Sequence, residues 1–205
     1  MKKLNRNGFT LIELLAVITI MGILMIVAIP AISRTIENTR RDMFLDTAKQ
    51  YVNSVKTLWT SDGLECPQNI GAISESGTNY NPAILSTSLA NGDYYVLIDS
   101  DNADEVLYPK LLESGGKSSW GNKEVQGFVR INVDGKKVNY YISLHDGTSS
   151  SDSGAHGITY ETAIGSSSIS AVSYLNLKRK HVVTEKAAAT FTIPITRTAR
   201  ICRIV

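Results

Sequence analysis

Residues 9–32 read FTLIELLAVITIMGILMIVAIPAI, an apolar run of 24 residues that carries one formal charge, at Glu13. As an α-helix this run is about 36 Å long, and the hydrocarbon core of a bilayer is about 30 Å thick. Lys2, Lys3 and Arg6 precede the run, and a basic flank is typical of the cytoplasmic side of a membrane helix. The sequence therefore predicts a membrane-crossing helix near the N-terminus.

Two ordinary explanations fit this run poorly. A secretory signal peptide has an apolar stretch of about 7 to 15 residues and a small-x-small cleavage site, whereas this run is longer and Pro30 interrupts the stretch from Ala28 to Ala31. A plain membrane anchor leaves Glu13 unexplained, because a carboxylate near the bilayer centre costs about 3 kcal/mol. We therefore expect Glu13 to have a function and a partner, with an accidental carboxylate that reaches the interface as the alternative.

The segment Gly8-Phe9-Thr10-Leu11-Ile12-Glu13-Leu14-Leu15 closely resembles the type IV prepilin signature, a short basic leader that ends in Gly before an aromatic residue and a long apolar helix. The resemblance implies that a prepilin peptidase cuts after Gly8 and methylates the new N-terminal amine of Phe9. It also implies a single-pass precursor in the cytoplasmic membrane, assembly machinery there, and copies of the chain or related pilins joined in an extracellular pilus.

The spacing of this signature suggests how copies join. Cleavage would expose a cationic amine on Phe9, four residues from Glu13, where the carboxylate of a neighbouring subunit can pair with it. Two opposite charges about 4 Å apart attract by roughly 4 kcal/mol at an effective dielectric constant near 20. Such a pair can offset the desolvation of both charges, so Glu13 and Phe9 are the expected assembly residues.

Two residues inside the apolar run disturb the helix. Pro30 has no N–H to donate to the carbonyl of Ile26, and Gly22 has no side chain. In type IV pilins the matching positions are points where the helix weakens on packing into the filament, and the resemblance carries that role to Gly22 and Pro30. The alternative is that membrane helices simply tolerate both residue types.

A helical pattern continues beyond the apolar run, with charged residues between apolar ones. Ser61-Asp62-Gly63 supplies a stop signal, so one helix is expected over residues 9–61. We expect a leader over 1–8, a membrane or filament-core helix over 9–32, an amphipathic helix over 33–61 and a β-rich headgroup over 62–205. The apolar residues expected on one stripe are Ile36, Met43, Phe44, Ala48, Tyr51, Val52, Val55, Leu58 and Trp59.

After Gly63 the chain shows short β-prone runs separated by Gly, Ser, Asn and Asp. Asp134-Gly135 between two such runs is a strong signal for a type I′ hairpin. The fold class is therefore α+β, with one long helix packed against an antiparallel sheet. Trp120-Gly121-Asn122 also resembles a motif of pilin headgroups. The expected strands are Tyr94–Ile98, Val125–Val133, Lys137–Leu144, Val172–Leu177, His181–Thr184, Phe191–Ile195 and Ile201–Val205.

The two cysteines, Cys66 and Cys202, suffice for one disulfide in an oxidising compartment. In many pilins a disulfide fastens the C-terminal region, but both partners usually lie late in the chain, and Cys66 departs from that pattern. A bridge and two free buried thiols remain alternatives.

The sequence shows no catalytic site, and we expect no enzyme activity, no cofactor and no metal. The three histidines, His145, His156 and His181, lack zinc-site spacing with either cysteine. The acidic run from Asp99 to Glu105 fails the EF-hand pattern because Ala103 occupies a ligand position. A calcium site of another kind stays open there, since some secretion pseudopilins bind calcium in a C-terminal loop, but a solvated turn is the simpler interpretation.

Charge is segregated along the chain. Residues 1–61, 62–161 and 162–205 carry net charges of +4, −8 and +6, which give the total of +2. The last segment could bind DNA, acidic polymers of a host surface or the acidic segment of a neighbouring subunit, or it could be a solvated face. Its expected basic patch consists of Lys178, Arg179, Lys180, Arg197, Arg200 and Arg203.

These observations favour a structural subunit of a type IV pilus that serves adhesion, motility or surface interaction. A minor pilin or pseudopilin of a type II secretion or DNA-uptake apparatus is the nearest alternative. A membrane-tethered adhesin or enzyme that never polymerises is the alternative from another class.

Overall fold

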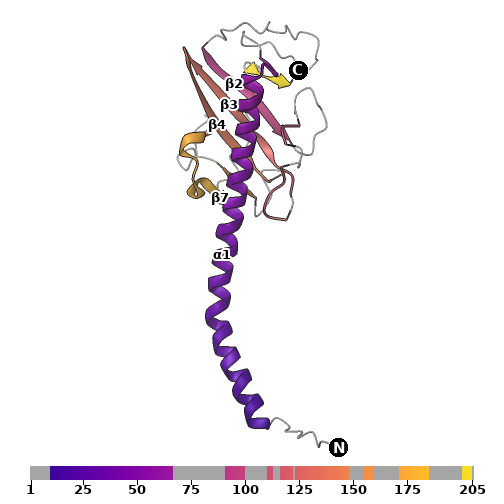
Figure 1. The fold of residues 1–205 in the computed structure, drawn as a ribbon, viewed down its shortest axis with the longest axis vertical. Coiled ribbons are helices and arrows are strands. Elements are labelled where there is room, and N and C mark those ends of the chain that lie inside the picture. The colour runs from indigo at the N-terminus through magenta and orange to yellow at the C-terminus, as the bar shows by residue number, and fades with distance from the viewer. Residues whose placement is uncertain are drawn as a thin grey trace, which may run out of the picture. The chain divides into compact units, whose positions relative to one another are not determined.

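The computed structural model describes residues 10–66, 91–99, 110–112, 116–121, 123–147, 155–158, 171–184 and 200–204. A long helix, α1 (Leu11–Thr60), is followed by short and long strands, and the chain divides into two compact units, Met1–Thr39 and Arg40–Val205. The strands are β1 (Leu64–Glu65), β2 (Gly92–Asp99), β3 (Gln126–Asp134), β4 (Lys137–His145), β5 (His156–Ile158), β6 (Val172–Ser173), β7 (Val182–Thr184), β8 (Arg200–Ile201) and β9 (Arg203–Ile204) (Figure 1).

In the second unit, α1 packs against one face of the sheet. Phe44, Ala48 and Val52 are fully buried and recur every four residues, the spacing that places side chains on one face of a helix. They meet the alternating residues Tyr94 and Val96 of β2 in one hydrophobic core. The structure thus confirms the α+β class.

The apolar stripe begins later than its sequence pattern predicted. Ile36 and Met43 are 48% and 56% exposed, and the first buried residue of α1 is Phe44. The helix ends at Thr60, and Asp62 takes the left-handed conformation (φ 55°) while the N–H of Gly63 donates to the carbonyl of Leu58. Asp62, rather than the glycine, therefore turns the chain out of the helix.

The main sheet has the order β7-β5-β4-β3-β2-β8, with β6 also paired to β4. β2, β3 and β4 form an antiparallel meander, but β8 pairs with β2 in parallel. The sheet is therefore mixed rather than wholly antiparallel as predicted. β1 and β9 form a separate antiparallel pair, and the sequence pattern missed both β1 and β5 because each is very short.

The β3–β4 turn differs from the predicted type. Asp134 pairs with Lys137, so the two central residues are Gly135 and Lys136. Gly135 has φ +58°, and Lys136 is not among the residues with positive φ. A positive φ at the first central position alone is typical of type II′ rather than type I′.

Two of the predicted strands in the described part of the chain are interrupted. Only Val172 and Ser173 of the run from Val172 to Leu177 are a strand, and a 3₁₀ turn, η2 (Tyr174–Asn176), follows. The Tyr174 hydroxyl donates to the side chain of Asn53 on α1. The C-terminal run is split at Cys202 into β8 and β9. The predicted strand Phe191–Ile195 lies outside the described residues.

Candidate functional site

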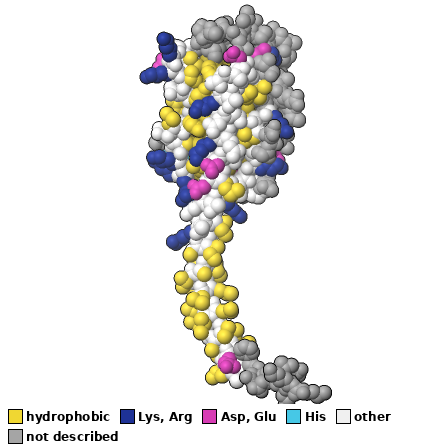
Figure 2. All heavy atoms as spheres, viewed as in Figure 1, with side chains coloured by type: hydrophobic (Ala, Val, Ile, Leu, Met, Phe, Trp, Pro, Cys, Tyr) yellow, Lys and Arg dark blue, Asp and Glu magenta, His cyan; other side chains and the backbone are white. Residues whose placement is uncertain are grey.

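The helix surface over residues 11–32 is apolar and uncovered in the single chain. The apolar part of α1 has no buried residues in the single chain, and the helix is long and apolar enough to cross a membrane. Figure 2 shows hydrophobic side chains along the visible face of this segment. Its most exposed members are Leu11 (82%), Ile26 (75%), Ile12 (74%) and Val27 (73%). An apolar surface of this kind needs lipid or another protein to cover it.

Glu13 forms a capping box with Thr10 at the start of this helix. The backbone N–H and the hydroxyl of Thr10 both donate to Oε2 of Glu13 at 2.8 Å, and the N–H of Glu13 approaches the Thr10 hydroxyl oxygen at 3.3 Å. This is the reciprocal arrangement of a Ser/Thr-x-x-Glu box, which satisfies N–H groups that have no partner in the helix. The Thr-x-x-Glu spacing is the sequence signal for this role, which was not among the roles expected for Glu13.

The capping box leaves part of the carboxylate for another partner. Both donors of Thr10 bond Oε2, and no hydrogen bond or ion pair from a described residue reaches Oε1. Thr10, which donates both of these bonds, follows Phe9 directly in the sequence. Gly8 and Phe9 themselves lie outside the described residues.

Gly22 and Pro30 lie within an unbroken helix. α1 continues through both residues, and a β-carbon on Gly22 would have no atom within 4 Å. The hydroxyl of Ser33 donates to the carbonyl of Ile29 at 3.0 Å, next to the proline. Whether these positions weaken the helix stays a prediction.

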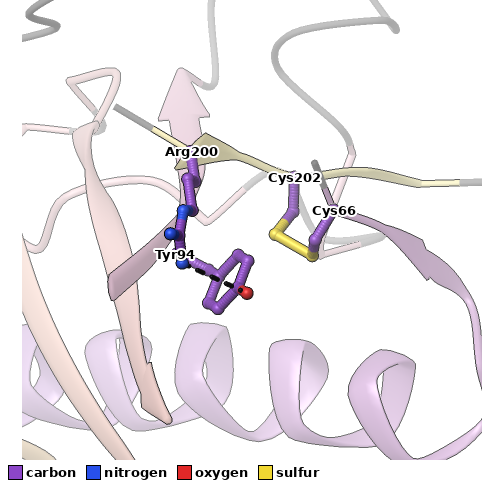
Figure 3. The surroundings of a disulfide bond; sticks show 4 residues. All are labelled: Cys66, Tyr94, Arg200 and Cys202. Carbon is purple, nitrogen blue, oxygen red and sulfur yellow. Dashed lines mark hydrogen bonds between the residues drawn. A yellow bond between two sulfur atoms is a disulfide. The ribbon is translucent and has the colours of Figure 1, made fainter. Parts of the chain in front are cut away.

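Cys66 and Cys202 form a disulfide across 136 residues of sequence (Figure 3). Cys202 lies between β8 and β9, and its N–H donates to the carbonyl of Tyr95 in β2. Arg203 adds an ion pair with Glu65 at 2.8 Å. The bridge therefore ties the C-terminus to the segment directly after α1.

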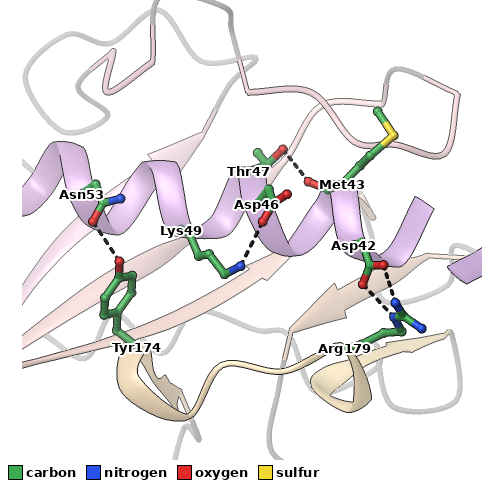
Figure 4. A network of polar contacts seen from close by, with 8 residues as sticks. All are labelled: Asp42, Met43, Asp46, Thr47, Lys49, Asn53, Tyr174 and Arg179. Atoms are coloured by element: carbon green, nitrogen blue, oxygen red, sulfur yellow. Dashed lines mark hydrogen bonds and ion pairs between the residues drawn. The ribbon is translucent and has the colours of Figure 1, made fainter. Parts of the chain in front are cut away.

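The structure does not gather the predicted basic patch on one surface. Arg200 stacks over Tyr94 and bonds its hydroxyl, and Arg203 pairs with Glu65. Arg179 donates from Nε and Nη2 to the carboxylate of Asp42 on α1, which holds the pKa of that carboxyl below its usual value (Figure 4). Arg197 lies outside the described residues. Lys178 and Lys180 remain exposed beside Arg179.

A buried polar cluster joins the loop before β3 to β5. The carboxylate of Asp146 accepts hydrogen bonds from the hydroxyl of Ser118 at 2.6 Å and from the N–H of His156. The ring of His156 stacks on Trp120 with centroids 3.7 Å apart. Ser118 bonds Asp146 rather than a histidine, so this is not the order of a nucleophilic triad. Among the described residues no group of His, Cys, Asp or Glu could hold a metal ion.

Comparison with known proteins points to the same family as the N-terminal sequence does. The family described as "Prokaryotic N-terminal methylation motif" matches residues 3–29. Two proteins of Pseudomonas aeruginosa, each named "Fimbrial protein", are 31% identical over 115 residues, which cover 56% of this chain and 71% of each relative. No solved structure matches.

The apolar N-terminal helix, the methylation motif and the sheet packed on α1 define a pilin-type filament protein. The chain belongs to the type IV pilin family of fimbrial proteins. It is therefore a structural protein and not an enzyme.

Proposed function

We propose that this chain is inserted in the cytoplasmic membrane as a prepilin, cut between Gly8 and Phe9, methylated on the amine of Phe9 and polymerised through α1 into an extracellular pilus. A prepilin peptidase and membrane assembly machinery would act on it, and the pilus would serve adhesion, motility or surface contact. The observation that carries this proposal is the uncovered apolar helix with Glu13 at its start.

The geometry supports a double role for Glu13. One oxygen closes the capping box, so the helix begins at a defined residue. The other oxygen would accept a hydrogen bond from the charged amine of Phe9 in a neighbouring copy. The two charges would form this ion pair as assembly removes both of them from water. An ion pair buried among apolar side chains is favourable only if both charges also keep hydrogen bonds. Thr10 donates two hydrogen bonds to the carboxylate.

Glu13→Gln separates the two roles. Glutamine can replace glutamate at the third position of a capping box, but it carries no charge. If the charge drives assembly, cells that carry Glu13→Gln will make a cleaved and stable chain but few or no pili, counted by electron microscopy and in sheared pilus fractions.

Thr10→Ala is the matched variant, because it removes the capping hydroxyl and keeps the carboxylate. We expect it to reduce pili less than Glu13→Gln does. Normal pilus numbers in Glu13→Gln would contradict the proposed ion pair. Mass spectrometry of the mature chain tests the processing step, and a protein that still begins at Met1 would refute it.

Purified fibres test the place of the chain in the filament. A chain that makes up most of the protein in sheared fibres is a pilus subunit in the ordinary sense. Its presence in trace amounts only would point to a minor pilin or pseudopilin instead.

A further inference from the structure

Basic residues from two parts of the chain come together at the start of the second unit. The unit begins at Arg40, and the 3₁₀ turn η3 (Arg179–His181) lies against the next turn of α1, since Arg179 pairs with Asp42. Arg41 donates to the carbonyl of Val182, directly after η3. We call the resulting group the basic collar; it consists of Arg40, Arg41, Lys178, Arg179 and Lys180.

The collar is held in place by contacts that leave its lysines exposed. The N–H of Lys178 donates to Nδ1 of His181 at 3.1 Å, and the ring of His181 is buried. Farther along α1, the Tyr174 hydroxyl bonds Asn53 (Figure 4). Lys178 and Lys180 thus project into solvent from a segment that is fastened to α1 on both sides.

The collar carries more positive charge than the acidic residues around it neutralise. The carboxylate of Asp42 is engaged by Arg179, and Glu37 is the other acidic residue within one turn of Arg40. Among the described residues, the five cations of the collar therefore outnumber the two acids of α1 that lie within one turn of Arg40. Because Asp42 and Glu37 both lie on α1, neither of them is part of the segment that carries Lys178 and Lys180.

The collar begins a short way along the sequence after the apolar run. Arg40 follows Ile32, the last residue of that run, by eight residues. Cations near a bilayer surface are attracted to anionic lipids. The positive-inside rule disfavours Arg40 and Arg41 on the side opposite the basic leader, so orientation in the membrane does not account for them.

We propose that the basic collar binds anionic phospholipid headgroups at the outer surface of the membrane and holds the headgroup against the bilayer before assembly. This inference rests on the proposed membrane-inserted prepilin. A lipid surface fits this group of cations, because its first two members, Arg40 and Arg41, follow the apolar run so closely in the sequence.

The test uses the full chain in lipid nanodiscs and hydrogen–deuterium exchange of the peptide that contains residues 174–184. Discs of phosphatidylcholine alone are compared with discs that also contain phosphatidylglycerol. We expect slower exchange in the anionic discs at low salt. That protection should disappear in high salt, because the collar is exposed and its attraction is screened.

Lys178→Glu with Lys180→Glu should abolish the lipid-dependent protection. The matched control is Lys136→Glu with Lys137→Glu, an exposed lysine pair in the β3–β4 turn. That turn lies near the opposite end of the unit, since Gly135 bonds Asn91 and the neighbouring Tyr94 packs on Trp59, at the end of α1. The control should keep the protection. Unchanged exchange in peptides of β3 and β4 will show that each variant is folded.

Several outcomes would overturn the inference. Equal exchange in both kinds of disc would do so, as would equal loss in the two lysine variants. Protection that increases with the number of chains per disc would indicate a second copy as the partner instead. If the chain is extracted from the discs by alkali, the proposed membrane insertion fails, whereas an inserted chain without lipid-dependent protection refutes the collar alone.

Discussion

The hydroxyl oxygen of Tyr51 lies 2.1 Å from the position that a β-carbon on Gly116 would occupy. Tyr51 is on the buried face of α1, and its ring is also within 3.0 Å of that position. Gly116 has φ +55°, a conformation that favours glycine. The loop before β3 therefore passes α1 at a distance that only glycine permits.

Gly116→Ala should destabilise the second unit by about 2 to 4 kcal/mol, from the strained φ and from overpacking against a buried ring. Gly135→Ala is the matched control, because Gly135 has φ +58° but no atom within 4 Å of its β-carbon position. It should cost about 1 kcal/mol. Urea unfolding of the detergent-solubilised chain measures both, and equal costs would contradict the close approach.

Loss of the disulfide should lower stability strongly. Closing a loop of 136 residues contributes about 4 to 5 kcal/mol in the chain-entropy description. We expect Cys66→Ser with Cys202→Ser to lower the unfolding midpoint in urea, and reducing agent to lower the midpoint of the natural chain to a similar value but leave the variant unchanged. A natural chain that is insensitive to a reductant able to break the bond would contradict this.

Tyr51 should make stability sensitive to alkali. Burial, and then the negative charge of Glu124, raise the pKa of Tyr51 to about 12, against about 10 in an unfolded chain. The stabilisation is fully present below pH 10 and is lost as the pH rises towards 12, because the unfolded chain loses this proton first. Tyr51→Phe should flatten the fall in unfolding free energy over that window, measured by urea titration at each pH. An unchanged slope would contradict the prediction.

Asp146 should make stability sensitive to acid. Burial alone would raise its pKa, but hydrogen bonds from His156 and Ser118 outweigh burial and hold the pKa of Asp146 below its ordinary value. Its contribution is present above the unfolded pKa, near 4, and is lost as the pH falls through the lower folded value.

Asp146→Asn tests this dependence. An amide cannot accept from both neighbours as the carboxylate does, so the variant should lose about 1 to 3 kcal/mol at pH 7. The difference from the natural chain should shrink below about pH 4. Ser118→Ala is the control, since it removes one donor and keeps the carboxylate; a constant difference between the natural chain and Asp146→Asn at every pH would refute the assignment.

The sequence was sufficient for the elements whose signals are local and long. An apolar run of 24 residues after a basic flank predicted the membrane helix, because length and charge decide where such a helix can reside. The family was indicated by the resemblance of Gly8–Leu15 to the prepilin signature. The β3–β4 hairpin was located correctly, since Asp134-Gly135 separates two β-prone runs. Its turn type was wrong because the pairing of Asp134 with Lys137 depends on the register of whole strands.

Contacts between distant residues were decided by the tertiary structure. Three such contacts join segments far apart in the sequence: the parallel pairing of β8 with β2, the bond from Tyr174 to Asn53 and the disulfide between Cys66 and Cys202. The burial of Phe44 rather than Ile36 depends on which part of α1 the sheet covers. No local pattern encodes such partners. The spacing of apolar residues along a helix or strand indicates which face a side chain lies on, but not which residue of another element it contacts. The basic residues show the same limit: sequence proximity grouped them, and the fold separated Arg179, Arg200 and Arg203 by giving each a different partner.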